Sequence, residues 1–353
     1  MARDMDKKSE YASLMPYFKE DGSLKREEIL SMMFEHEYGW LKECQHTHFF
    51  KELGKEKWGC GNITKMLLEM DVLFTDSLAR VPFTAFLPDM NTLCPVFLYL
   101  SFDGRFPGEC LPVEEICDNG FGIVTFDYQE AAKDQDDQFM GILERSLIGP
   151  RSKNTAGKIR LWAEAASMIM DYVVDMEGVD KNHIAVIGHS RLGKAALLAG
   201  ALDQRFKYTI VNESGCGGAS LNLHRQGESI EEMTRKFPWW YAEKFRDYQS
   251  NNMAMQFDQH FILALVAPRY LYVASAQGDT GADIQGEKMA CILAGEAYKK
   301  LGRKGFVEES SSLHGSQCFM EGDIGYHLRP GQHFLGRFDW NMFMKFINLK
   351  RKP

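Results

Sequence analysis

From residue 94 onward the sequence alternates continuous apolar runs with helical patterns, and this alternation constrains the fold more than any other feature. The apolar runs are 96–100, 122–126, 184–187, 208–211 and 270–274. Helical patterns occupy about 157–175, the residues leading to 202, and about 287–300. Strands that are apolar throughout are buried on both faces, and helices between them make parallel crossovers. The sequence therefore predicts an α/β fold, a three-layer αβα sandwich around a mostly parallel sheet.

The first 88 residues follow a different pattern. Residues 62–88 alternate apolar and polar side chains in two runs, 66–74 and 81–87, separated by a polar turn, which predicts an antiparallel hairpin. Residues 1–60 are polar and partly helical, so we expect a wrapping segment there, followed by a single domain over 61–353. An insertion at about 214–258, rich in glycine, charge and aromatics, follows a strand and is expected over the rim of a site.

Charge and composition exclude several classes of partner. A net charge of -8 argues against nucleic acid or an anionic membrane as the main partner. No apolar segment approaches transmembrane length. The N-terminus lacks the apolar core of a secretory signal, so we expect a cytoplasmic protein, or a secreted one if a signal was removed. The eight cysteines form no C-x-x-C pair, which agrees with a reducing compartment.

The heptapeptide at 188–194, Gly-His-Ser-Arg-Leu-Gly-Lys, lies between the apolar run 184–187 and a helical pattern. A strand, a sharp turn and a helix, with Ser190 at the apex, is the arrangement of a serine nucleophile, whose helix directs its positive end toward a developing anion. Leu192 stands where such a turn usually has its second glycine. The alternative is that Ser190 only caps the helix.

A serine nucleophile needs a base. In α/β folds that place the serine at a strand–turn–helix junction, the order along the chain is Ser, Asp or Glu, then His. His333 lies in a glycine and proline loop before the C-terminal helical pattern 340–347, so we predict that it is the base. His327 and His314 are rivals. His260 precedes a buried run and is expected to be a hydrogen-bonded structural histidine.

Two carboxylates are placed to orient that base. Glu213 follows the strand pattern 209–212, and Asp279 follows 271–274 in a loop of small residues. Either can reach an imidazole at the carboxyl edge of the sheet, and the alternative for each is a solvated or turn-forming loop carboxylate. Asp283 is expected to cap the next helix.

Two cations flank the serine. Arg191, directly after it, would supply an oxyanion-stabilising N–H and guanidinium, and Lys194 lies one helical turn further on. They suggest a polar or anionic substrate, and the alternative, which the sequence alone slightly favours, is that they pair with acidic loops.

Metal and cofactor sites are not predicted. Possible ligands alternate over 44–48, but no second cluster completes a tetrahedral zinc site. The glycines at 215–218 lack the lysine and the helix of a phosphate-binding loop. We therefore expect neither a metal nor a cofactor.

Several separate motifs resemble the glucuronoyl esterase family, α/β-hydrolase carbohydrate esterases that cleave esters between 4-O-methyl-glucuronic acid on xylan and lignin alcohols. They are the heptapeptide 188–194, Asn-Glu-Ser-Gly-Cys-Gly-Gly at 212–218, Asp-Gln-His at 258–260 followed by Ala-Pro-Arg at 267–269, and Gly-Tyr-His-Leu-Arg-Pro-Gly-Gln-His at 325–333 with Asp-Trp at 339–340. The motifs span nearly the whole chain in the family's order.

The resemblance implies roles for individual residues. Ser190 would be the nucleophile, His333 the base and Arg191 an oxyanion stabiliser, with Lys194 and Glu228 contacting sugar hydroxyls. It favours His333 over His327.

The resemblance leaves two points open. Members place the acid after either of two strands, and we expect Glu213 to be important and Asp279 to assist. The family usually has a tryptophan two residues after the second acid, which packs on the glucuronate; here that position is Gly281. Trp239 or Trp240 from the insertion could replace it, and core packing is the alternative for both.

The predicted activity is thus hydrolysis of (4-O-methyl-)glucuronic acid esters, through an acyl-enzyme on a Ser-His-Glu/Asp triad and without a cofactor. The substrate would be a small-molecule or oligosaccharide ester from glucuronoxylan–lignin linkages. Removal of acetyl or other acyl groups from carbohydrate is the first alternative, and a non-catalytic carbohydrate-binding relative is the second. The sequence leaves the oligomeric state open.

Overall fold

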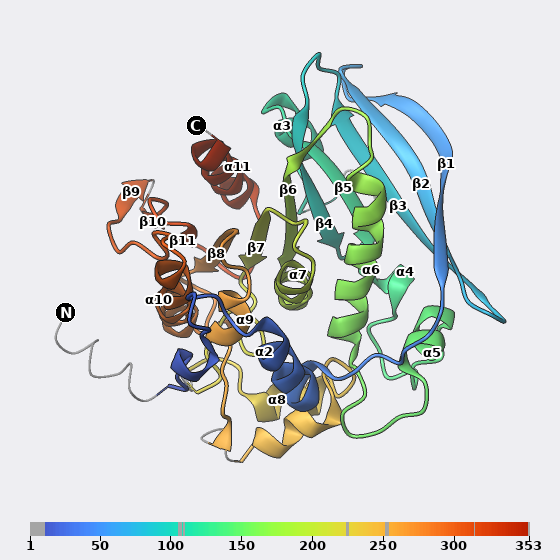
Figure 1. The fold of residues 1–353 in the computed structure, drawn as a ribbon. Coiled ribbons are helices and arrows are strands. Elements are labelled where there is room, and N and C mark those ends of the chain that lie inside the picture. The colour runs from blue at the N-terminus through green and yellow to red at the C-terminus, as the bar shows by residue number, and fades with distance from the viewer. Residues whose placement is uncertain are drawn as a thin grey trace.

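One twisted sheet extends across the whole molecule in the computed structural model, which describes residues 11–104, 108, 110–223, 226–250, 254–313 and 315–351 (Figure 1). Within these residues the sheet has 11 strands in the order β1-β2-β3-β5-β4-β6-β7-β8-β11-β10-β9. The strands are β1 (Thr47–Trp58), β2 (Ile63–Leu73), β3 (Leu78–Pro88), β4 (Cys94–Ser101), β5 (Gly122–Asp127), β6 (Val179–His189), β7 (Tyr208–Asn212), β8 (Tyr270–Ala276), β9 (Ser311–Leu313), β10 (Ser316–Phe319) and β11 (Ile324–Arg329).

Helices connect and cover these strands. The longer ones are α2 (Arg26–Met33), α6 (Lys158–Val173), α7 (Arg191–Leu202), α10 (Ile284–Lys300) and α11 (Arg337–Arg351). Shorter helices are η2 (Met15–Tyr17), η3 (Phe34–Tyr38), α3 (Val113–Asp118), α4 (Tyr128–Ala131), α5 (Ile142–Ile148), α8 (Ile230–Lys236), η4 (Glu243–Tyr248) and α9 (His260–Ala264).

The centre of the sheet is parallel, as the sequence predicts. Strands β5, β4, β6, β7, β8 and β11 pair in parallel, whereas β1, β2 and β3 are antiparallel at one edge and β10 and β9 at the other. All eight residues of β4 and all five of β7 are buried, which explains why these strands appear as continuous apolar runs.

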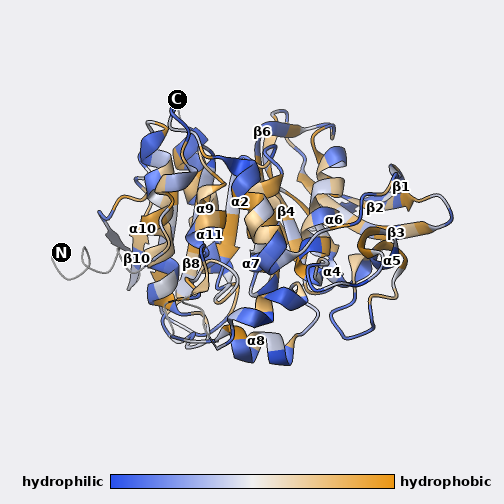
Figure 2. Cartoon of the chain, turned by 60° about the horizontal axis from the view of Figure 1, so that its bottom comes forward, coloured by the Kyte–Doolittle hydropathy of each residue, from blue (hydrophilic) through white to orange (hydrophobic). Residues whose placement is uncertain are grey.

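Two hydrophobic cores, one on each face of the sheet, make the predicted three-layer sandwich. Helices α6, α7, α9 and α10 contribute to one core, with Trp162 fully buried in it. Helices α3 and α11 contribute to the other, where Trp340 is fully buried. In Figure 2 the central strands are largely hydrophobic, whereas α8, in the insertion at one end of the molecule, is largely hydrophilic. The αβα prediction is confirmed.

The expectation of a purely wrapping segment over residues 1–60 was wrong in one respect. Strand β1 lies within that segment and pairs with β2 along its length, from Thr47–Leu73 to Trp58–Ile63. The predicted boundary at residue 60 therefore falls in the turn of a hairpin. Because β1 is an edge strand whose side chains are all exposed or only partly buried, its apolar residues follow no regular alternation.

The insertion places α8 beyond the carboxyl ends of the parallel strands, near the start of α7 (Figure 2). Its backbone is tied to the main domain: the amides of Lys158 and Ile159, at the start of α6, donate to the carbonyls of Trp239 and Trp240 at 2.9 and 3.1 Å. Among the described residues we find no helix with the length and apolarity needed to span a bilayer.

Candidate active site

Ser190 stands at a sharp turn between β6 and α7. Its backbone has φ 57° and ψ -128°, a region that a non-glycine residue rarely adopts. The turn needs Gly188, because a Cβ there would lie 2.0 Å from the carbonyl oxygen of Leu192. Gly193 packs against Ser214, whose Cβ would be 3.1 Å from an added Cβ. The second glycine of the turn is thus displaced by one position but still serves close packing.

The hydroxyl of Ser190 does not cap α7. Ser190 occupies the N-cap position, yet its side chain makes no capping hydrogen bond. Its backbone is held instead, since its N–H donates to the carbonyl of Asn212 at 2.9 Å. The structure therefore argues against the helix-cap interpretation and leaves the hydroxyl at the positive end of a helix.

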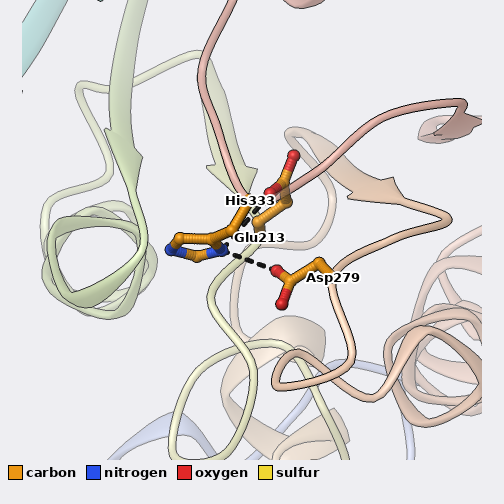
Figure 3. A group of neighbouring side chains, drawn as sticks. All are labelled: Glu213, Asp279 and His333. Atoms are coloured by element: carbon orange, nitrogen blue, oxygen red, sulfur yellow. Dashed lines mark hydrogen bonds and ion pairs between the residues drawn. The ribbon is translucent and has the colours of Figure 1, made fainter.

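His333 contacts both predicted acids (Figure 3). Its Nδ1 lies 2.6 Å from Oδ2 of Asp279 and 3.3 Å from Oε2 of Glu213. The nearer carboxylate is also fixed by its own loop, because the amides of Gly281 and Ala282 donate to its Oδ1 at 3.1 and 3.2 Å. These distances reverse the order expected from the resemblance: Asp279 is the closer partner and Glu213 the second.

The two carboxylates favour a proton on His333. Burial lowers the pKa of its imidazole, but hydrogen bonds and charge from Asp279 and Glu213 outweigh burial and raise the pKa to about 9. Burial raises the pKa of Asp279, yet the bond and charge of His333 leave it below its ordinary value. Burial dominates for Glu213 and raises its pKa.

Of the rival histidines, His327 and His260 are buried and hydrogen-bonded. His327 is fully buried, with Nε2 2.9 Å from Oδ1 of Asp339 and Nδ1 3.0 Å from the hydroxyl of Tyr272. His260 is buried against the carbonyl of residue 12 at 2.9 Å, and burial lowers its pKa to about 4. His314 lies outside the described residues.

A histidine that the sequence reasoning passed over packs against His333. The ring of His189 is buried, and its centroid is 4.5 Å from that of His333. Burial lowers the pKa of His189 to about 3, so this ring stays neutral beside the base. The amide nitrogen of Asn212 lies 2.9 Å from its Nδ1, which therefore accepts a hydrogen bond.

Ser190 and His333 line one cavity of about 570 Å³. Both acids and the predicted substrate residues Lys194 and Glu228 also line this cavity. The other described residues that line it are Arg191, Ser214, Gly215, Gly227, Glu232, Lys236, Phe237, Trp240, Thr280, Gly281 and Ala282. The residues singled out in six separate stretches of sequence thus meet around one space.

Arg191 is held by a carboxylate that gave no signal in the sequence. Its Nη1 donates to Oδ2 of Asp134, a side chain only 4% exposed. Asp134 also accepts bonds from the indole nitrogens of Trp239 and Trp240, at 2.8 and 2.7 Å, and from the hydroxyl of Tyr128 at 2.9 Å. Burial raises the pKa of Asp134, but these donors hold it below its ordinary value.

The two tryptophans of the insertion differ in position. Trp240 lines the cavity and stacks on Phe237 with centroids 3.9 Å apart, and the guanidinium of Arg191 lies 5.1 Å from its ring centroid. Trp239 is not among the described residues that line the cavity, and its predicted substrate contact stays a prediction. Its indole is directed to Asp134.

Glu213, Asp279 and His333 also have ligand atoms within 4.8 Å of one another, as a metal site requires. Both carboxylate oxygens of Glu213 already accept hydrogen bonds from protein groups. Oε1 of Glu213 accepts from Arg329 at 2.7 Å, and its Oε2 accepts from the amide of Phe334 at 3.0 Å. A histidine held by two carboxylates that already have protein hydrogen-bond donors fits a proton-transfer site better than a cation site.

Comparisons with known proteins agree with this geometry. The family model for glucuronyl esterases of fungi matches residues 106–302, more than half of the chain. The chain belongs to the glucuronyl esterase family. The resemblance seen in the motifs is thereby confirmed.

Individual glucuronyl esterase relatives match to different extents. The carbohydrate esterase MZ0003 of an unknown prokaryotic organism is 40% identical over 196 residues, which are 56% of this chain and 45% of that protein. The 4-O-methyl-glucuronoyl methylesterase of Podospora anserina is 31% identical over 177 residues, 47% of this chain and 36% of that protein. The matches thus span less than half the length of these curated relatives.

A solved glucuronoyl esterase from Solibacter usitatus has a TM-score of 0.85 and 28% identity, and the match covers 97% of this chain and 98% of that one. The α/β-hydrolase fold is confirmed, because this similarity extends over nearly the whole of both chains.

The residues carried over from the glucuronyl esterase motifs now have defined surroundings. Lys194 is buried, and its Nζ donates to the carbonyl of Ser214 at 2.6 Å and to that of Cys216, leaving one N–H for a ligand. Burial lowers its pKa. Glu228 is half-buried at the cavity, with its amide bonded to the carbonyl of Gly281 at 2.9 Å.

The position where the family usually has tryptophan is open. A Cβ on Gly281 would meet only Oδ1 of Asp279 within 4 Å, at 3.5 Å. Of the predicted replacements, only Trp240 reaches the cavity wall. Asp283, expected as a cap, does cap α10 through the amide of Gly286 at 3.0 Å.

Proposed function

We propose that this chain is a serine ester hydrolase that cleaves esters of (4-O-methyl-)glucuronic acid, as found in glucuronoxylan–lignin linkages and the oligosaccharides derived from them. One observation carries the proposal: Ser190 at a strained turn and His333 on two carboxylates line the same cavity as Lys194 and Glu228. Family membership and the full-length similarity to a glucuronoyl esterase structure support it.

The first half of the reaction is acyl transfer to Ser190. Because Asp279 holds Nδ1 of His333, Nε2 is left to accept the proton of the serine hydroxyl as oxygen attacks the ester carbonyl. The oxyanion that forms lies at the start of α7, where the helix N-terminus and the guanidinium of Arg191 stabilise it. His333 then returns the proton to the leaving alcohol.

In the second half, water replaces the alcohol. His333 removes a proton from water, the hydroxide attacks the acyl carbon, and the uronate leaves as Ser190 recovers its proton. Lys194 and Glu228 supply a cationic donor and an anionic acceptor, the two partners that vicinal sugar hydroxyls need. No step requires a cofactor.

The decisive assay compares two substrates. We expect faster turnover of a benzyl ester of glucuronic acid than of an acetylated xylo-oligosaccharide, with Ser190→Ala inactive on both. A higher kcat/KM on the acetylated substrate would refute the uronate assignment and support the second candidate, a carbohydrate acyl esterase. The open position at Gly281 favours that candidate, because residue 281 has no aromatic side chain that could pack against a uronate ring.

A non-catalytic carbohydrate-binding role predicts a different result. Labelling by a serine-directed fluorophosphonate tests it, because the reagent reports on the activated hydroxyl whatever the substrate. We expect labelling of the intact chain and none of Ser190→Ala. An unlabelled intact chain would favour the binding role.

A further inference from the structure

Arg329, the last residue of β11, forms hydrogen bonds with every donor of its guanidinium group. The side chain is 10% exposed, and it forms hydrogen bonds with the loop that carries His333. Nη1 donates to the carbonyls of Pro330 and Gln332 at 3.1 and 3.3 Å, and Nη2 donates to the carbonyl of Phe334. The carbonyls on both sides of His333 are therefore fixed by one group.

The remaining two donors of Arg329 bind carboxylates. Nη2 donates to Oε1 of Glu213 at 2.7 Å, and Nε donates to Oδ1 of Asp339 at 2.8 Å. A guanidinium has five N–H donors, and all five are used here. A lysine has three donors on one atom and cannot reproduce this arrangement.

His333 itself is not held by packing alone, because its side chain is 43% exposed. Its position depends on the loop between β11 and α11, in which the amides of Phe334 and Gly336 are bonded to Glu213 and Asp339. Both of those carboxylates are bonded to Arg329, so the loop, the base and the second acid share one anchor.

We propose that Arg329 is the positioning residue of this active site: it sets the conformation of the loop that carries His333 and keeps Glu213 as a charge-compensated carboxylate behind Asp279. The role rests on the proposed serine hydrolase activity. Arg329 acts through other residues and contacts no reacting atom.

The charges around the base determine what loss of Arg329 does. His333 faces Asp279, Glu213 and the neutral ring of His189. Glu213 in turn faces His333 and Arg329, and the carboxyls of Asp339 and Glu287.

Without the guanidinium, Glu213 is a buried carboxylate among other acids and takes up a proton. Because its oxygen lies only 3.3 Å from Nδ1 of His333, that neutralisation lowers the pKa of the base.

The test is the rate of fluorophosphonate labelling of Ser190 as a function of pH in Arg329→Gln and Arg329→Lys. Labelling needs a neutral His333, so its rate rises with pH through the pKa of the base. For Arg329→Gln we expect a rate about 100-fold lower from misplacement of the base, and a rise displaced by about one pH unit toward acid. For Arg329→Lys, which keeps the charge, we expect a lower rate with the rise in its original place.

Arg269 provides a matched control. It is equally buried, and its hydrogen bonds to the described residues go to backbone carbonyls, those of Asp203, Phe206 and Leu265. Arg269→Gln should lower the melting temperature without displacing the pH profile. Arg329→Gln with the wild-type rate and profile would overturn the proposal, as would a displaced profile in Arg269→Gln. A wild-type chain that does not label would instead refute the serine mechanism and this role with it.

A compensating pair covers the case in which Arg329→Gln folds poorly. The added change Glu213→Gln removes the uncompensated buried carboxylate, so the double variant should melt at a higher temperature than Arg329→Gln alone. A double variant no more stable than the single one would contradict the charge compensation on which the role depends.

Discussion

Replacing Asp279 by asparagine tests the division of labour between the two acids. The carboxylates together raise the pKa of His333 from 6.5 to about 9. One pKa unit corresponds to about 1.4 kcal/mol. Because the side chain of His333 is 43% exposed, solvent screens part of this interaction, and we assign about 1–2 kcal/mol to the two acids jointly. Asp279, at 2.6 Å against 3.3 Å for Glu213, supplies the larger part.

Two effects follow for Asp279→Asn. The asparagine amide cannot enforce the tautomer of His333 as a carboxylate does, so kcat/KM at its plateau falls by about 10²- to 10⁴-fold. The pKa of His333 also falls, since the nearer negative charge is gone. A base must be neutral to act, so the rise of kcat/KM with pH moves to lower pH. For Glu213→Gln we expect a loss of about 10-fold and a smaller displacement.

The assay is the pH dependence of kcat/KM on a benzyl glucuronate ester for wild type, Asp279→Asn and Glu213→Gln, with Ser190→Ala as the blank. Melting temperatures of all four chains separate loss of fold from loss of chemistry. A larger loss in Glu213→Gln than in Asp279→Asn, at equal stability, would refute the reasoning from distances. Profiles that do not move in either variant would show that these acids do not set the pKa of His333.

Three further changes have expected outcomes. Asp134→Ala leaves four donors without their acceptor, so we expect the free energy of unfolding, measured with denaturant, to fall by about 2–4 kcal/mol. Hydrolysis should also be slower, because Arg191 is released. Unchanged stability would contradict this prediction. Gly281→Trp places a ring where space is open, and should lower KM for a uronate ester while Gly281→Ala leaves it unchanged; an unaltered KM in both would count against that wall as a sugar contact. Gly188→Ala would put a Cβ 2.0 Å from the carbonyl of Leu192, so its circular dichroism and activity should both show a damaged turn, and normal activity would disprove the need for glycine.

Local patterns predicted the layout of the fold. The strands β4 and β7 are buried throughout, so their apolar runs could be recognised without any contact information. Strand β1 could not, because it lies at the sheet edge with both polar and apolar residues on its exposed positions, and only its pairing with β2 makes it a strand. The partner of Trp239 could not be predicted for a related reason: its indole is directed to Asp134, which lies 105 residues away in the chain.

For the site, the sequence by itself determined the chemical groups and their order: Ser190 in a strand–turn–helix pattern, then the two carboxylates, then His333. That order follows from strand–loop connections, which are local. Only the tertiary structure decided that Asp279 is nearer than Glu213 to Nδ1 of His333, that Arg329 is bonded to Glu213, and that Asp134 is bonded to Arg191. Differences of less than an ångström between carboxylates, and bonds between segments far apart in the chain, depend on how the whole sheet packs. The turn at Ser190 therefore indicated the proposed reaction, and the packing around it determined which residues surround the serine.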